Sequence, residues 1–319
     1  MTRSSALSAL ALPAAGGWDF GDYLYAVEPL TLPHPHEPAS APGPLAAAEV
    51  EDGCLAFLAQ VRAGVPATDP VDQGGLERLF WFRWMVGHHV SFVIWRLIAG
   101  ALARIAAGDS DREALSEAVA HYVQGYCGML LYTGSSDRRI YNDVIRPSMY
   151  RQHSTFSGTW APDYPPVRSL FRGRRRPPVA DPYVEAVARE VHLASELHFG
   201  VAAKLVVGGR SLLQTSIAER DAAQPRMWGA IFDCYFVTLR VPVSTPQLVA
   251  QLLRRQKAIA IDLATNGLYP AGAVEDLPSE LRQPAARACA EDLTNSLCRV
   301  AGLAAGLTLD RVNKELGCT

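Results

Sequence analysis

Apolar residues recur at helical spacing along most of the chain, and this pattern predicts a mainly α-helical protein. The predicted helices cover residues 44–64, 75–107, 114–132, 181–207, 245–267 and 284–306. Ser110 and Glu113 have the spacing of a capping box before the third of these helices, and Asp181-Pro182 is a typical helix start. The stretch 230–243 fits a strand and a buried helix equally well, because a short apolar run has no decisive period.

Two proline-rich segments interrupt this helical pattern. Six prolines between Pro29 and Pro44 predict that residues 1–44 form an irregular N-terminal arm. Residues 45–319 then form a single all-α domain. The second segment, Gly134–Val179, is longer than most connections within a compact domain, so we expect it to have a function of its own.

The composition narrows the possible function classes. Of 319 residues, 49% are hydrophobic and 19% are charged. The charged fraction is below the about 25% of ordinary soluble domains, which favours a large interior, a buried ligand or a subunit interface, and we expect a homodimer. The net charge of −2 argues against nucleic acid as a partner. The sequence has no run of eighteen uncharged apolar residues, so it predicts no membrane span. The scattered cysteines suggest reduced thiols in a cytoplasmic protein.

Common nucleotide-binding, zinc-protease and serine-hydrolase motifs are absent from the sequence. Histidines on helices therefore remain as the candidate functional residues. On a helix over 181–207, His198 lies in the middle of the apolar stripe, within about 40° of Val191 and Ala194. His192 points about 120° away, towards charged residues. His198 is therefore either a core histidine with one hydrogen bond or an imidazole ligand to a buried metal or haem.

The helix over 75–107 is rich in aromatic residues. His88 lies one turn after Trp84 and one turn before Phe92, whereas His89 points about 100° away. This arrangement is typical of an aromatic core helix. It is also compatible with the wall of a large planar cofactor that His88 faces.

The segment from Arg139 to Arg176 alternates arginines with aromatic residues and glycine. Such a run often forms a solvated surface that binds phosphate. Because arginine binds carboxylates through two parallel hydrogen bonds, the same segment could also cover a pocket and bind a small acid.

Three stretches together resemble a known family: WFRWMVGHHVSFVIW (81–95), RIYNDVIRPSMYRQHSTFSGTWAPDYPPVRSLF (139–171) and EVHLASELHFG (190–200). They look like the haem-dependent L-tyrosine 3-hydroxylases of antibiotic biosynthesis. These belong to the haem-dependent aromatic oxygenases, which are distantly similar to tryptophan 2,3-dioxygenase. The resemblance implies a helical bundle that encloses haem b. It also implies conversion of L-tyrosine to L-DOPA with hydrogen peroxide as the oxidant.

The resemblance also implies roles for individual residues. His198 matches the iron ligand, with His192 as the alternative, and His88 matches the catalytic distal histidine. The residues expected to contact haem are Trp84, Phe92, Thr159 and Trp160, and those expected to bind the substrate are Arg146, Arg151, Ser157 and Gly158. Cys234 is the cysteine nearest to the position where one branch of the family attaches its haem, but its surroundings do not match, so we expect non-covalent haem.

Three alternatives stay open. A dioxygenase that opens an indole ring would keep both histidines. A non-catalytic protein that binds haem or another flat ligand would absorb near 400 nm, by analogy with other histidine-ligated haems, without forming a product. A helical interaction protein with core histidines would be colourless.

Overall fold

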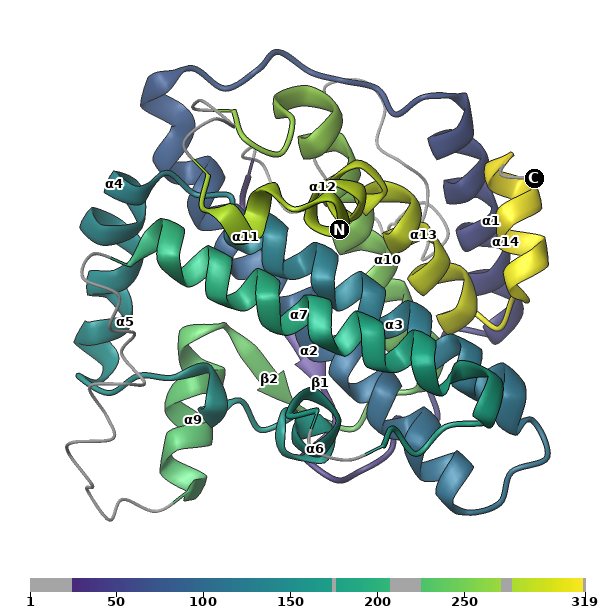
Figure 1. Cartoon of the computed structure of the whole chain (residues 1–319). Helices are drawn as coiled ribbons and strands as arrows, with labels where there is room; N and C mark the ends of the chain where they lie inside the picture. Colours follow the sequence, from purple (N-terminus) through teal and green to yellow (C-terminus); the bar gives the residue numbers. More distant parts are fainter. Residues whose placement is uncertain (1–24, 174–175, 207–224, 271–276, 318–319) are drawn as a thin grey trace.

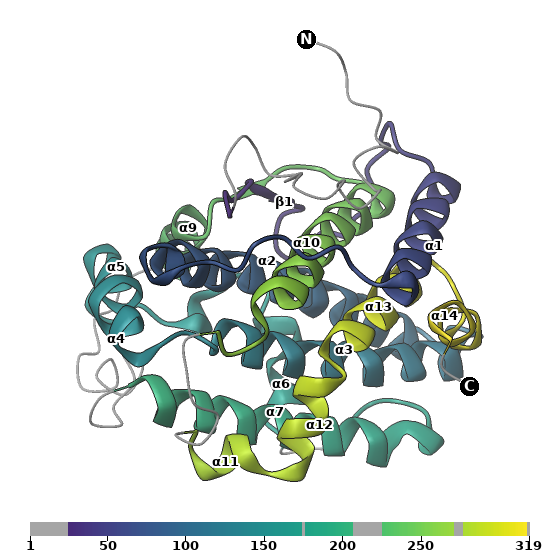
Figure 2. The same ribbon diagram turned by 90° about the horizontal axis from the view of Figure 1, so that it is seen from above.

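The computed structural model describes the chain except for residues 1–24, 174–175, 207–224, 271–276 and 318–319. The fold is mainly α-helical, as the sequence predicts (Figures 1 and 2). The longer helices are α1 (Ala47–Ala63), α2 (Leu76–Ala106), α3 (Arg112–Thr133), α7 (Val184–Leu205), α9 (Pro225–Tyr235), α10 (Thr245–Asn266) and α13 (Leu293–Ala304). The shorter helices are α4 (Arg138–Ile140), α5 (Arg146–Gln152), α6 (Arg168–Phe171), α11 (Ser279–Arg282), α12 (Pro284–Glu291) and α14 (Leu309–Leu316).

Helix α2 is the central element of the fold. It forms a helical hairpin with α3 and also packs against α10, and its Phe82, Val86 and Val93 side chains are fully buried. Gly87 lets α3 approach closely, because a Cβ atom at this position would overlap Thr133. By length and composition alone α2 could also cross a membrane, but a buried core helix meets the same criterion.

The other long helices form layers around this hairpin. Figure 2 shows α7, α11 and α12 on one side of α3, with α2 and α10 on the other. Helix α13 packs against α3 and α10, and α1 pairs with α14 at the edge of the fold. At the contact between α3 and α13, a Cβ atom on Gly125 would overlap Val300, so glycine allows the close approach.

The segment Gly134–Val179 consists mainly of short helices. Helix α4, a π-helical turn (Tyr141–Ile145) and α5 follow one another without a break. The Asp137 carboxylate starts this run by accepting hydrogen bonds from the backbone N–H groups of Arg139 (2.8 Å) and Ile140 (3.2 Å). Two 3₁₀ turns, Gly158–Trp160 and Pro165–Val167, and α6 complete the segment.

The ambiguous stretch 230–243 contains both a helix and a strand. Helix α9 ends at Tyr235, and strand β2 (Thr238–Arg240) pairs in parallel with β1 (Leu30–Leu32). The proline-rich arm is described from residue 25 onwards. It is extended, but Leu30 and Leu32 are fully buried, so the arm packs into the body of the protein.

Two details of the predicted helices are wrong. No capping box forms at Ser110 and Glu113, because α3 starts at Arg112 and the residue before it makes no side-chain cap bond. The predicted helix over 284–306 is two helices, α12 and α13, with Asp292 between them. The Asp292 carboxylate forms an ion pair with Arg299 of α13 (2.6 Å), which stabilises this break.

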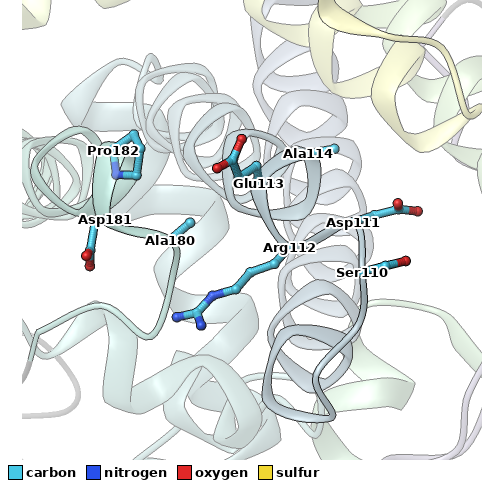
Figure 3. A pocket seen from close by; sticks show the side chains of 8 residues that line it. All are labelled: Ser110, Asp111, Arg112, Glu113, Ala114, Ala180, Asp181 and Pro182. Atoms are coloured by element: carbon cyan, nitrogen blue, oxygen red, sulfur yellow. The ribbon is translucent and has the colours of Figure 1, made fainter.

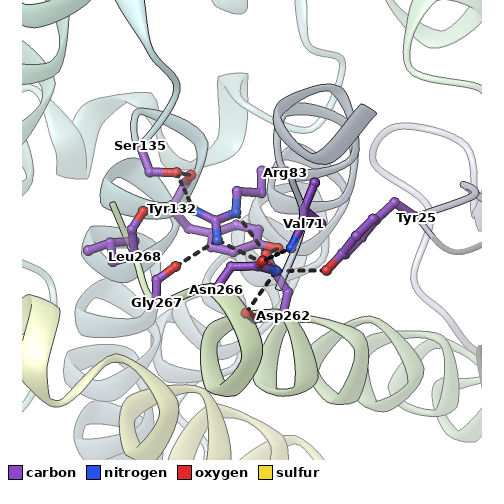
Figure 4. A network of polar contacts seen from close by, with 9 residues as sticks. All are labelled: Tyr25, Val71, Arg83, Tyr132, Ser135, Asp262, Asn266, Gly267 and Leu268. Atoms are coloured by element: carbon purple, nitrogen blue, oxygen red, sulfur yellow. Dashed lines mark hydrogen bonds and ion pairs between the residues drawn. The ribbon is translucent and has the colours of Figure 1, made fainter. Parts of the chain in front are cut away.

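A buried polar network ties α2, α3 and α10 together (Figure 4). The Arg83 guanidinium binds both carboxylate oxygens of Asp262, at 2.8 and 2.9 Å. Its remaining N–H groups donate to Ser135 and to the backbone carbonyls of Gly267 and Leu268, at 2.7–2.9 Å. Asp262 also accepts a hydrogen bond from the Tyr132 hydroxyl (2.6 Å). All five N–H donors of the arginine therefore have partners, so the buried charge is fully compensated.

Candidate functional site

A cavity of about 430 Å³ lies between α2, α3, α7, α9 and the segment 141–171. Its walls are mainly apolar and include Trp84, Trp95, Leu130, Phe156, Val191, Phe232 and Phe236. A few polar side chains interrupt them, and His88 and His198 are both among these. An apolar cavity with a few converging polar groups is the usual form of a ligand site.

Helix α2 and Phe236, the residue that follows α9, hold the His88 ring. The ring lies 4.2 Å from the Trp84 ring and is stacked on Phe236 at 4.6 Å, measured between centroids. Its Nδ1 atom lies 2.6 Å from the Trp84 carbonyl oxygen. Because a carbonyl only accepts hydrogen bonds, Nδ1 carries the proton, and Nε2 keeps its lone pair. No described residue hydrogen-bonds to Nε2.

The surroundings of His88 also set its charge. The sequence alone suggests a pKa close to the ordinary value of about 6.5. In the structure, desolvation by burial lowers the pKa of His88 to about 4, and the hydrogen bond to Trp84 only partly opposes this shift. His88 is therefore neutral at pH 7, and its Nε2 atom can accept a hydrogen bond.

His198 reaches the cavity from α7. The His198 side chain is exposed, in contrast to the buried apolar face on which the sequence places it, yet the surrounding protein still lowers its pKa by desolvation. Neither ring nitrogen hydrogen-bonds to a residue that the structure describes. A neutral imidazole with an unused lone pair beside an apolar cavity has the properties of an axial haem ligand.

The face of α7 around His198 suits a flat cofactor. Val191, Ala194 and Ser195 line the cavity on the two turns that precede His198, and all three side chains are small. A planar ring system could lie against such a low surface while His198 reaches its centre. Within the described part of the chain, no group of three or more His, Cys, Asp or Glu side chains could hold a bare metal ion.

Several other predicted site residues line the same cavity: Trp84, Arg146, Ser157, Gly158 and Thr159. The Ser157 hydroxyl accepts a hydrogen bond from the Thr159 backbone N–H (3.2 Å), which shapes the turn at the cavity wall. Arg146 lies close enough to Tyr141 for its charge to oppose the increase in the Tyr141 pKa that burial causes.

Other predicted residues do not line the cavity. Phe92 is buried behind His88, with ring centroids 6.1 Å apart. Trp160 packs on Trp228 instead, at 3.8 Å between centroids. The remaining three, Arg151, His192 and Cys234, are exposed and lie outside the cavity lining.

Sequence patterns did not single out Tyr126, Tyr141, Phe232 and Phe236, which also line the cavity. Tyr141 begins the π-helical turn, a feature that is frequent at functional sites but has no reliable sequence signature. Phe232 and Phe236 are four residues apart on a segment whose secondary structure the sequence left open, so their shared face was not predictable.

Two other hollows lack this chemistry. Figure 3 shows a surface hollow at the starts of α3 and α7, lined by residues 110–114 and 180–182. Half of its lining residues are charged, and they include no histidine or aromatic ring. A groove of about 1060 Å³ between the N-terminal arm, α2, α3 and α13 is lined largely by aliphatic residues. His36 is the histidine among its described lining residues.

Comparison with known proteins points to one kind of chemistry. Residues 33–183 match the family model described as SfmD 3-methyl-L-tyrosine peroxygenase. A similar curated protein, 3-methyl-L-tyrosine peroxygenase from Streptomyces lavendulae, is 36% identical over 96 residues, which are 28% of this chain. The chain matches only about a quarter of that relative's length (25%). The part of the chain that the family model matches contains His88, Arg146 and residues 157–159, whereas His198 lies beyond it.

Proposed function

We propose that this protein is a haem-dependent peroxygenase that hydroxylates the ring of L-tyrosine at the 3-position to give L-DOPA in antibiotic biosynthesis. One observation carries the proposal: His88 and His198 reach the same apolar cavity with nitrogen lone pairs that no described residue uses. The match of residues 33–183 to a tyrosine peroxygenase family supports it.

In this proposal the haem is bound through His198. The group would supply oxygen transfer from a peroxide to an aromatic carbon. Val191, Ala194 and Ser195 provide the low surface against which it lies. The apolar walls lower the local dielectric constant, so each polar group of the cavity interacts more strongly with what is bound there.

His88 is the proposed acid–base group. Its Nε2 atom accepts a proton either from hydrogen peroxide or from the phenol hydroxyl of the substrate, and it can return that proton later. Removing the phenol proton makes the ring carbon next to the hydroxyl more electron-rich, which favours oxygen transfer to that position. Because His88 is neutral at pH 7, it can take up the proton without first losing one.

Arg146 is the proposed partner of the substrate carboxylate. A carboxylate that leaves water for an apolar cavity needs a cation, and Arg146 is the arginine among the described lining residues. Ser157, Gly158 and Thr159 offer hydroxyl or backbone N–H donors nearby on the same wall.

Haem binding is tested first, by absorption spectroscopy of the purified protein after addition of haemin. The wild type is expected to take up haem with a peak near about 400 nm. His198→Ala should lose most of this absorbance, whereas the matched control His192→Ala, on the same helix but outside the cavity, should keep it. If His192→Ala loses haem and His198→Ala does not, the ligand assignment is wrong.

Product analysis then tests the reaction. L-Tyrosine, 3-methyl-L-tyrosine and L-tryptophan are each incubated with hydrogen peroxide or with oxygen and a reductant, followed by mass spectrometry. We expect one added oxygen atom on L-tyrosine with peroxide. The name of the relative, 3-methyl-L-tyrosine peroxygenase, makes 3-methyl-L-tyrosine the competing substrate. Two added oxygens on tryptophan would indicate a dioxygenase, and haem uptake without any product would indicate a binding protein.

A further inference from the structure

Two consecutive histidines, His88 and His89, contact the same residue, Phe236. His88 lies on the Phe236 ring, with centroids 4.6 Å apart and planes inclined by 24°. The Nε2 atom of His89 lies 2.5 Å from the Phe236 carbonyl oxygen. Helix α2 therefore holds the segment after α9 at two points, one on the side chain and one on the backbone.

The second histidine is itself fixed in one tautomer. Since the Phe236 carbonyl only accepts hydrogen bonds, Nε2 of His89 must carry a proton. Its Nδ1 atom then accepts a hydrogen bond from Nε of Arg255, at 3.3 Å. His89 is fully buried, and burial and the positive charge of Arg255 both lower its pKa far below the ordinary value, so it stays neutral.

Arg255 is held as firmly as His89. Its side chain is fully buried on α10 and forms an ion pair with Glu28 at 3.3 Å. It also donates to the backbone carbonyls of Gln251 (3.0 Å) and Pro29 (3.1 Å). Both nitrogens of His89 are therefore used, in contrast to the free Nε2 of His88.

The backbone next to Phe236 is strained. Val237 has φ = 49°, in the left-handed region that β-branched residues rarely adopt. Such a conformation typically costs about 1–3 kcal/mol and persists only where the surrounding structure imposes it. Here the Val237 carbonyl accepts a hydrogen bond from Leu30 N–H (3.1 Å), and the Phe236 carbonyl on its other side binds His89.

We propose that His89 is a positioning residue for His88, and that it acts through Phe236. Arg255 fixes the tautomer of His89, His89 fixes the Phe236 backbone, and the Phe236 ring then holds the His88 ring against Trp84. With the Phe236 ring stacked on it and the Trp84 ring tilted against it, the His88 ring keeps Nδ1 on the Trp84 carbonyl and Nε2 towards the cavity. This inference rests on the proposed function, which gives the Nε2 atom of His88 its chemical role.

The charged and titratable groups around His88 do not provide this orientation. They are His89 on its own helix and, from the other walls of the cavity, Tyr126, Tyr141, Arg146, Tyr164 and His198. Among the described residues, none of these side chains hydrogen-bonds to His88, whose polar contact is the Trp84 carbonyl. The rings of Phe236, Trp84 and Phe92 and the Trp84 carbonyl are therefore the contacts that set its orientation.

The test compares His89→Leu, which removes the hydrogen bond to Phe236, with His89→Gln, whose side-chain N–H can still donate to that carbonyl. His192→Leu is the matched control for exchanging a helical histidine outside the cavity. The first readout is NMR of the full-length chain with labelled histidines and without added haem, in which His88 is assigned from the signal lost in His88→Asn. The second readout is haem content together with kcat and KM of the haem-loaded protein.

We expect His89→Leu to give a mixture of His88 tautomers, because the Phe236 ring is then no longer fixed against the His88 ring. Haem content and KM should change little, whereas kcat should fall about tenfold or more, because misplacing a reacting group slows the chemical step. His89→Gln should remain close to the wild type in both readouts. An unchanged His88 signal in folded His89→Leu, or equal loss in the Gln and Leu variants, would overturn the proposal.

Phe236→Leu keeps the test decisive if His89→Leu does not fold. This variant retains the backbone carbonyl and its bond to His89 but removes the ring under His88. It should produce the same change in the His88 tautomers, and a wild-type signal would again overturn the proposal. Because the NMR measurement needs no turnover, a wild type that forms no product contradicts the proposed function and leaves the test of the positioning role intact.

Discussion

Arg83 and His88 lie five residues apart on α2 and illustrate two ways in which this protein buries polar groups. Arg83 uses all five of its N–H groups, and its partner Asp262 accepts further hydrogen bonds from Tyr132 and Asn266. His88 uses Nδ1 alone, and its Nε2 atom has no partner among the described residues.

The difference between the two regions separates architecture from function. A buried polar group without a partner costs roughly 1–3 kcal/mol, so folded proteins rarely leave one. The Arg83 network avoids this cost completely and joins α2, α3 and α10. The unpaired groups of the cavity avoid this cost only in part, because water can occupy the cavity until a ligand replaces the water. Incomplete pairing beside a cavity is therefore the signal for a binding site, and complete pairing is the signal for a structural element.

The largest expected effect is the loss of stability when the Arg83–Asp262 network is disrupted. Arg83→Met leaves the Asp262 carboxylate buried without its cation and should lower the free energy of unfolding by about 3–5 kcal/mol, as is typical for one half of a buried ion pair. The measurement is urea unfolding followed by circular dichroism. The double variant Arg83→Met/Asp262→Leu should recover part of the loss, because no uncompensated charge then remains.

A matched surface pair provides the control for that prediction. Arg311 and Glu315 form an exposed ion pair one helical turn apart (3.0 Å). Arg311→Met should cost less than about 1 kcal/mol. If both arginine variants lower stability equally, the buried network does not have the structural role assigned to it.

Substitution of His88 in the cavity should affect activity far more than stability. His88→Asn removes the acid–base nitrogen, and kcat should fall by about 10²–10⁴-fold while haem content stays close to that of the wild type. Steady-state kinetics and the haem absorbance check the two parts separately. Full activity in this variant would show that another group moves the proton.

Acid titration tests the charge state of His88. Its pKa is about 4 in the folded chain and about 6.5 when unfolded, so between these values the unfolded chain binds more protons. The contribution of neutral His88 to the free energy of unfolding should therefore be fully present above about pH 6.5. It should fall by up to about 3 kcal/mol as the pH drops to 4. Urea unfolding without haem at several pH values measures this slope. His88→Asn should reduce this pH dependence only in part, since the lowered pKa of buried His89 also makes the protein less stable at low pH.

The smallest of these effects concerns substrate binding. Arg146→Ala should raise KM for L-tyrosine about 10–100-fold, because the carboxylate loses a charged hydrogen-bond partner in a cavity with little water. Arg151→Ala, on the same segment but exposed and outside the cavity, is the control. For tyramine, which has no carboxylate, Arg146→Ala should change KM little. Equal KM values for L-tyrosine in both arginine variants would place the carboxylate elsewhere.

The sequence alone determined the helical class and most helix positions. The hydrophobic period of α2, α7 and α10 is long and regular, and such patterns depend only on local geometry. The same periodicity placed His198 on the side of α7 that carries Val191 and Ala194, and all three residues line the cavity. The family resemblance added Arg146 and residues 157–159, four positions that also line it.

Only the tertiary structure decided which of these residues meet. It separated Arg146, which lines the cavity, from Arg151, which does not, because this difference depends on contacts with distant segments. It also gave His89 a partner in Arg255, which is 166 residues away. No local pattern encodes such a contact. The burial that lowers the pKa of His88 has the same origin, since α9 and the segment 141–171 form the desolvated cavity only after the chain has folded.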